Sequence, residues 1–147
     1  MGNDQIIFRL CRAQHGLVTL DQLLDAGLAR STISDRVGSG WLEPVDHRVF
    51  RVAAVAPSWS QQVHALVLAG EPHALAARRS AAALWQLDGS RRSVVEVVVP
   101  RWRRRHLRSG RVIESTDLRP QDAARRDGIP VTAVARTVID CGATAHP

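Results

Sequence analysis

Six arginines lie between positions 101 and 111, the densest run of charge in the sequence. Guanidinium groups at this density neutralise phosphates and displace their counterions, which is the chemistry of nucleic-acid binding. Trp102 lies in the same run and can stack on a base or on a guanidinium plane. A solvated basic loop that meets an acidic protein is the alternative, and charge density favours nucleic acid. We therefore predict an auxiliary basic patch of Arg101, Arg103, Arg104, Arg105, Arg108 and Arg111.

A second group of polar residues occurs at positions 30–36, where helical spacing directs Ile33 and Val37 toward a core. Side chains on the opposite face can then contact a DNA groove. Threonine and serine hydroxyls bond to base edges or phosphates, and arginine can pair with guanine through two bonds. An ordinary solvated helix face is the alternative. The predicted DNA contacts from this helix are Arg30, Ser31, Thr32, Ser34 and Arg36.

Two β-prone runs, 41–45 and 49–52, flank the tripeptide Asp46-His47-Arg48, a pattern that indicates a hairpin. His47 and Arg48 at its tip can enter a minor groove or contact phosphates. A polar hairpin tip without such a role is the alternative. Trp41 is expected to pack under this hairpin as part of the core.

Few residues are arranged for catalysis. All 20 basic side chains are arginine, so a P-loop and a lysine Schiff base are excluded. The 6 histidines are scattered and show no zinc-ligand spacing. Asp88 and Glu96 mimic the acidic half of a restriction-type nuclease site, but Val98 occupies the place of its lysine. We therefore predict no catalytic residue, no metal and no cofactor.

The elements that position the candidate residues follow a clear order. Helical periodicity at 4–15, 19–25 and 32–37 precedes the hairpin, which is the order of a winged helix-turn-helix. Thr19 and Ser31 are expected to cap the second and third helices. Further along, we expect a helix capped by Ser58, an alanine-rich helix through 74–85, and short strands at 94–99, 112–113 and 129–131. A last helix, 133–141, is expected after a cap at Thr132.

This order predicts an α+β fold with two domains. Residues 1–55 are expected to form the winged helix-turn-helix and residues 56–147 a small α/β domain with a short sheet. The chain has a net charge of +6, but residues 1–52 are neutral, because six arginines balance six acids. The sequence shows neither a secretory signal nor a membrane span, so the expected compartment is the cytoplasm. Cys11 and Cys141 are expected to be core residues.

Three stretches together resemble a known family. They are GLVTLDQLLDAGLARSTISDRVGSGWLEPV at 16–45, RRSAAALWQLDG at 78–89 and DGIPVTAVARTVIDC at 127–141. In this order they resemble the antitoxin (AbiEi-like) component of type IV abortive-infection toxin–antitoxin systems, in the actinobacterial branch. The resemblance implies a DNA-binding head that represses its own operon. In many related proteins a nuclease-like domain follows the last helix, so the sequence is expected to be a fragment or a natural short form.

The expected function is therefore transcriptional repression by an antitoxin that autoregulates its operon. Its expected partners are double-stranded operator DNA, a cognate toxin and a second copy of the chain in a homodimer, with no membrane. One alternative is a protein–protein module that neutralises a toxin without binding DNA, which the neutral N-terminal segment favours slightly. The other is the N-terminal part of a nuclease-like protein without its catalytic domain.

Overall fold

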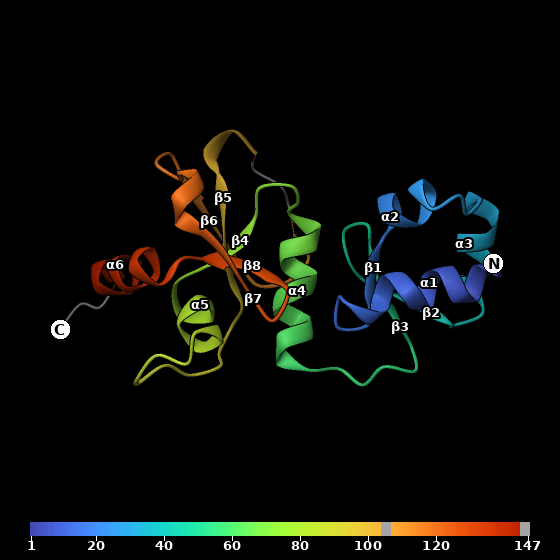
Figure 1. Ribbon diagram of the computed structural model, residues 1–147, viewed down its shortest axis with the longest axis horizontal. Helices are drawn as coiled ribbons and strands as arrows, with labels where there is room; N and C mark the ends of the chain where they lie inside the picture. Colours follow the sequence, from blue (N-terminus) through green and yellow to red (C-terminus); the bar gives the residue numbers. More distant parts are fainter. Residues whose placement is uncertain (104–106, 145–147) are drawn as a thin grey trace.

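The computed structural model describes residues 1–103 and 107–144 and has the α+β architecture that the sequence predicts (Figure 1). Two sheets lie on either side of one helix, and the first and last described helices, near residues 3 and 144, lie toward opposite ends of the long axis. The first half contains α1 (Asn3–Arg12), β1 (Leu17–Thr19), α2 (Leu20–Asp25), α3 (Arg30–Gly38), β2 (Leu42–Asp46) and β3 (Val49–Val52). The second contains α4 (Trp59–Ala69), β4 (Leu75–Ala76), α5 (Arg78–Leu84), β5 (Glu96–Pro100), η1 (Arg101–Arg103), β6 (Arg111–Ser115), η2 (Pro120–Asp122), β7 (Ala123–Arg126), β8 (Ile129–Thr132) and α6 (Val134–Thr144).

The first sheet is antiparallel, in the order β1-β3-β2. The apolar faces of α1, α2 and α3 pack on it, and Ile7, Leu23 and Ile33 lie in the shared core. Cys11 belongs to the same core, and burial raises the pKa of its thiol to about 12, so the group stays protonated. Three helices followed by a hairpin are the winged helix-turn-helix arrangement expected from the sequence.

Local hydrogen bonds explain where the helices begin. Thr19 caps α2 as predicted, because its hydroxyl accepts from the backbone of Gln22 while the Gln22 side chain accepts from the backbone of Thr19. The predicted cap at Ser31 is wrong. Helix α3 begins at Arg30, its N-cap is Ala29, and no side chain caps it.

The second sheet is mixed, in the order β6-β5-β4-β8-β7. Strands β5 and β6 run parallel, as do β4 and β8, while β4 and β5 are antiparallel. Both α4 and α5 cover one face, where Val97 and Val131 share a core with Val63 of α4 and Ala81 of α5. Among the described residues no helix is both long and apolar enough to cross a membrane.

The segment 116–122 crosses the other face of this sheet. It joins β6 to β7, which are the two outer strands, and it therefore spans the whole width of the sheet. Leu118 of this segment and Leu75 of β4 line the same cleft. Leu75 directly precedes Ala76 in the strand, so its side chain lies on the sheet face opposite to that of Ala76. The crossing segment is thus the cover of the sheet face that α4 and α5 leave open.

Two predictions about the second half are wrong. The alanine-rich run predicted as one helix, 74–85, contains β4 before α5 begins at Arg78. Ala76 is fully buried and pairs with Val97 on one side and Val131 on the other, so sheet pairing outweighs the helix propensity of alanine. Thr132 ends β8 instead of capping α6, and its hydroxyl contacts that of Thr137 at 2.7 Å.

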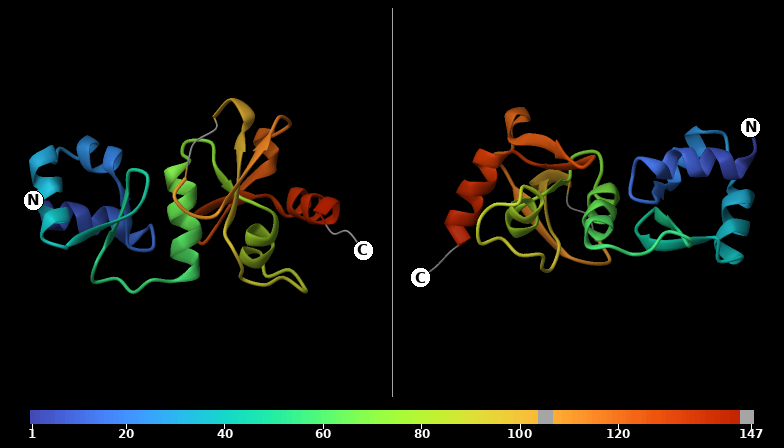
Figure 2. Two further views of the ribbon diagram at one scale, coloured as in Figure 1. Left: turned by 180° about the vertical axis from the view of Figure 1, so that it is seen from behind. Right: turned by 60° about the horizontal axis from the view of Figure 1, so that its bottom comes forward.

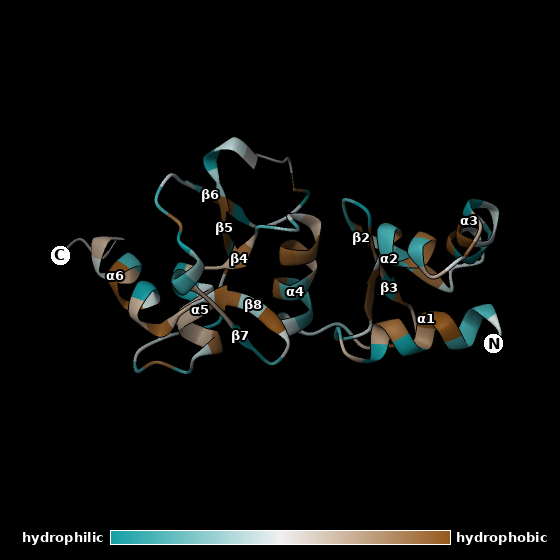
Figure 3. Cartoon of the chain, turned by 45° about the horizontal axis from the view of Figure 1, so that its top comes forward, coloured by the Kyte–Doolittle hydropathy of each residue, from teal (hydrophilic) through white to brown (hydrophobic). Residues whose placement is uncertain are grey.

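Helix α4 joins the two sheets, as Figure 2 shows from two further directions. One side of α4 packs on the second sheet, and the other side places Ala65 and Leu68 against Leu17 and Val49 of the first. Figure 3 shows the apolar colouring of α4 and of the strands beside it. The Gln61 side-chain amide also donates to the carbonyl of His15 at 2.7 Å. The N-terminal sheet is therefore held against α4 by both apolar and polar contacts.

Candidate nucleic-acid interface

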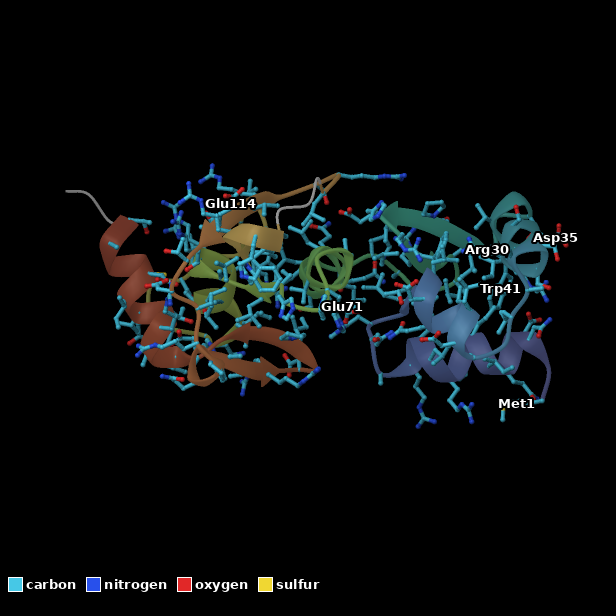
Figure 4. The ribbon with its side chains drawn as sticks, turned by 90° about the horizontal axis from the view of Figure 1, so that it is seen from above. Met1, Arg30, Asp35, Trp41, Glu71 and Glu114 are labelled. Carbon is cyan, nitrogen blue, oxygen red and sulfur yellow. The ribbon has the colours of Figure 1, made fainter. Side chains whose placement is uncertain are left out.

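Helix α3 presents the polar face that the sequence predicts. Ile33 is buried and anchors the helix, whereas Arg30, Ser31, Ser34 and Asp35 are exposed and Thr32 is half-buried. Figure 4 shows Arg30 and Asp35 at the end of the molecule that α3 forms. The first backbone N–H groups of an α-helix have no partner within the helix, and in α3 no side chain caps them either, so they suit an anion such as phosphate. The helix start and its exposed hydroxyls can thus serve a DNA groove.

Among the candidates on α3, Arg36 differs in that its guanidinium already has partners within the domain. Its guanidinium pairs with Asp4 of α1 at 2.6 Å and lies 5.5 Å from the centre of the Trp41 ring. The Arg36 side chain is 34% exposed. A contact from Arg36 to a base would therefore replace an existing ion pair. Nothing in the sequence pattern of α1 pointed to Asp4 as its partner.

The wing is a tight hairpin whose tip carries the two predicted basic residues. Strand β2 ends at Asp46 and β3 begins at Val49, so only His47 and Arg48 form the connection, and both are exposed. Arg48 has a φ of 56°, in the left-handed region that favours glycine. Its guanidinium pairs with Asp21 of α2, which fixes its direction.

Asp46, a residue that the sequence analysis did not single out, connects the wing to the arginine-rich segment. Its side chain is buried and accepts hydrogen bonds from the backbone N–H of His47 at 2.7 Å and of Arg108 at 3.1 Å. Its second oxygen accepts from the Ser109 hydroxyl at 3.3 Å. Leu107 packs beside Leu17 and Val49. The wing tip and the end of the basic segment are therefore neighbours in space.

Two other predicted patch residues, Arg101 and Arg111, lie at the ends of strands of the second sheet. Arg101 is exposed after β5, and Arg111 is 66% exposed at the start of β6, 3.4 Å from Glu96. The side chain of Arg103, and the whole of Arg104 and Arg105, lie outside the described residues. Of the predicted patch, Arg108 is the member that the structure fixes beside the wing.

Residues 5–53 match the protein family described as "Transcriptional regulator, AbiEi antitoxin". These residues form the three helices and the hairpin whose exposed polar groups are described above. The N-terminal domain belongs to the AbiEi antitoxin family of transcriptional regulators. This match confirms the AbiEi resemblance for the N-terminal domain, which supplies both α3 and the wing.

One solved structure is similar to a larger part of the chain. It is the crystal structure of the RV2827C protein from Mycobacterium tuberculosis, with 20% sequence identity and a TM-score of 0.45. The match covers 76% of this chain and 44% of that protein, so the chain spans less than half of its length. No curated protein matches the chain.

The acidic residues considered for a nuclease site have structural contacts instead. Glu96 is buried in the second half of the chain and accepts from the backbone N–H of Arg79 at 3.1 Å, while its own backbone N–H donates to the Ser80 hydroxyl at 2.8 Å. Asp88 is exposed in the turn that follows α5. Across the described ranges, no three histidine, cysteine or carboxylate side chains group closely enough to hold a metal ion.

Two histidines meet where the AbiEi domain contacts α4. The Nδ1 atoms of His15 and His64 lie 2.9 Å apart, and the two rings meet edge to face at 5.1 Å. Burial, together with the nearby His15 and Arg125, lowers the pKa of His64 to about 4. A hydrogen bond between two ring nitrogens needs one of them unprotonated, and the low pKa of His64 provides it.

The low pKa of His64 predicts a loss of stability in mild acid. The unfolded chain takes up this proton near pH 6.5 and the folded chain only near pH 4. Between these values the unfolded state binds more protons, so stability falls as pH falls, by about 3 kcal/mol across the whole window. Urea unfolding of wild type and His64→Gln measures this effect. The difference in free energy of unfolding between wild type and His64→Gln should change between pH 6.5 and 4 and stay constant above pH 7. A difference that is constant at every pH would contradict the prediction.

Proposed function

We propose that this chain is a sequence-specific transcriptional repressor that binds a DNA operator and regulates its own operon as the antitoxin of a type IV system. The observation that carries the proposal is the hydrogen bond from Arg108 to Asp46, which places a basic segment beside the wing of an AbiEi domain. The family assignment of residues 5–53 supports the regulatory role. Cytoplasmic location, and a homodimer on paired half-sites, belong to the same proposal.

In this proposal α3 lies in the major groove and the wing contacts the neighbouring backbone. Ser34 and Thr32 read base edges, Arg30 and Ser31 hold phosphates at the helix start, and His47 and Arg48 contact the minor-groove side. Arg36 contributes indirectly, because its pair with Asp4 fixes α3 against α1.

The proposal also accounts for the neutral charge of the N-terminal segment. Three of its arginines are already paired with acids, in the pairs Arg36–Asp4, Arg48–Asp21 and Arg51–Glu43. General affinity for phosphates must then come from elsewhere, and the segment around Arg108 lies close enough to supply it. Recognition of the DNA sequence and general affinity for phosphates are thus divided between two protein segments that meet at Asp46.

The experiment that tests the proposal measures binding to the DNA upstream of the chain's own gene. Arg30→Ala should weaken this binding about tenfold, because it removes a charged contact at the start of the reading helix. Arg9→Ala, which removes an exposed arginine from α1, should leave the affinity within a factor of two. Gel shifts with this duplex and with a scrambled duplex give both values. No preference of the wild-type chain for its own upstream DNA would contradict the repressor proposal.

A protein partner, the cognate toxin of the antitoxin hypothesis, is supported by one further feature. Helix α6 exposes Val138 at 55% and Ile139 at 67%, which is unusual for apolar side chains in the middle of a helix. This face of α6 is separate from α3 and the wing, so one chain has room to bind a toxin and DNA at the same time. A toxin gene directly beside this one would support the assignment.

A further inference from the structure

We propose that the cleft between η1 and the crossing segment 116–122 binds one unpaired nucleotide, stacking its base on Trp102 and holding its phosphate with Arg119. The cleft has a volume of about 650 Å³, within the range of pockets that take small organic ligands. It lies in the second sheet domain, away from α3, and operator binding by the AbiEi domain does not require it.

The position of the cleft follows from the sheet. Strands β5 and β6 are parallel, and their last residues, Pro100 and Ser115, are paired with each other and both line the cleft. Sheets with parallel strands commonly bind ligands beyond the carboxyl ends of those strands, where loops diverge. Here the diverging segments are η1, which follows β5, and residues 116–122, which follow β6.

The aromatic wall suits a base. Trp102 is 70% exposed, and its ring meets that of His73 at 5.2 Å with an angle of 64° between the planes. An edge-to-face neighbour of this kind supports the indole in one orientation. Stacking on an exposed aromatic ring recognises any base, because every base has a π-face.

The charged wall suits a phosphate. Arg101 and Arg119 both line the cleft, and none of its lining residues is acidic. Arg119 is 70% exposed and its nearest carboxylate, Asp122, is 4.0 Å away, so most of the guanidinium faces water. Thr116 also lines the cleft and adds a hydroxyl to its polar groups. A planar apolar group and an anion are the two parts of a nucleotide.

The rim of the cleft is held in place by contacts that a ligand would not disturb. Arg136 donates to the Asp117 carboxylate at 3.0 Å and to Asp122 at 3.3 Å, at either end of the crossing segment. It also donates to the Ser115 hydroxyl at 3.4 Å. A preformed rim lowers the entropy that binding must offset.

The test uses the full chain and three probes: adenosine monophosphate, a twelve-residue oligothymidylate, and inorganic phosphate. Calorimetry, or anisotropy of a labelled oligomer, measures the binding. Saturable binding of the monophosphate or of the oligomer supports a nucleotide site in the cleft. Binding of the monophosphate points to a free nucleotide, and binding of the oligomer alone points to a single strand. Trp102→Ala should lower either affinity about tenfold and Arg119→Ala several-fold. Arg91→Ala, an exposed arginine outside this cleft, should change neither.

Three results would overturn the proposal. One is binding of phosphate as tight as that of the nucleotide, because the base would then contribute nothing. The second is an equal loss in Trp102→Ala and Arg91→Ala. The third is no saturable binding of either nucleotide probe. Duplex operator binding by Trp102→Ala separates this site from the repressor proposal. We expect that affinity to stay at the wild-type value, whether or not the cleft takes a nucleotide.

Discussion

Replacing Arg136 with alanine should lower the free energy of unfolding by about 3 kcal/mol. The Arg136 side chain is only 15% exposed and bonds to three carboxylates: Asp140 at 2.9 Å, Asp117 at 3.0 Å and Asp122 at 3.3 Å. Asp122 and Asp140 are themselves mostly buried, so the alanine variant leaves negative charges without their partner in a poorly solvated place. The same change frees the crossing segment 116–122 from α6. Urea or thermal unfolding of the purified chain measures the loss.

The matched control for Arg136 is Arg119, which contacts the same carboxylate from outside. Arg119 lies 4.0 Å from Asp122 and is 70% exposed, so solvent screens most of that attraction. Arg119→Ala should therefore change the free energy of unfolding by less than about 0.5 kcal/mol. Equal losses in the two variants would show that Arg136 is one surface arginine among others, contrary to the structure.

Replacing Asp46 should weaken operator binding about tenfold even though it removes a negative charge. Asp46 accepts from His47 and Arg108 at once, so its loss releases both the wing tip and the basic segment. Electrostatics alone predicts the opposite sign, because removing a carboxylate raises the affinity of a protein for DNA. Asp46→Ala is the variant of choice, because asparagine would keep the one oxygen that accepts from both backbone N–H groups. Anisotropy of labelled operator DNA measures the affinity, and circular dichroism confirms that the variant is folded.

Glu43→Ala provides the comparison for Asp46→Ala. Glu43 lies on the same strand and pairs with Arg51 on β3, so its replacement removes the same charge and leaves the hydrogen bonds of Asp46 in place. We expect Glu43→Ala to bind the operator as well as wild type or slightly better. If Asp46→Ala also binds as well as wild type, the connection between wing and basic segment has no role in DNA binding.

Local signals in the sequence were sufficient to predict the N-terminal domain. Apolar spacing placed Ile33 in the core, Thr19 capped α2 as its side chain allows, and the polar tip at His47 marked the hairpin. Each of these features depends on residues within a few positions of one another. The family resemblance of the same region rests on the same local pattern.

Features that depend on distant residues were not predictable. Strand β4 is short and alanine-rich, and only its pairing with β5 and β8 makes it a strand. Strand β7, four residues long and mostly exposed, carries no apolar alternation that could have revealed it. The partners of Arg36 and Asp46 lie 32 and 62 positions away, respectively, in Asp4 and Arg108. The contact between the wing and the basic segment was not predictable for the same reason.

The dependence of operator affinity on salt tests most directly whether Arg108 and the wing form one DNA-binding surface. A phosphate contact contributes about −0.9 to the slope of log K against log salt concentration. For Arg108→Ala, that slope should be smaller than the wild-type slope by about 1 in magnitude, with a similar loss on specific and scrambled duplexes. Arg91→Ala, which removes an exposed arginine far from the wing in sequence, should keep the wild-type slope. An unchanged slope for Arg108→Ala, or the same decrease in Arg91→Ala, would contradict the account.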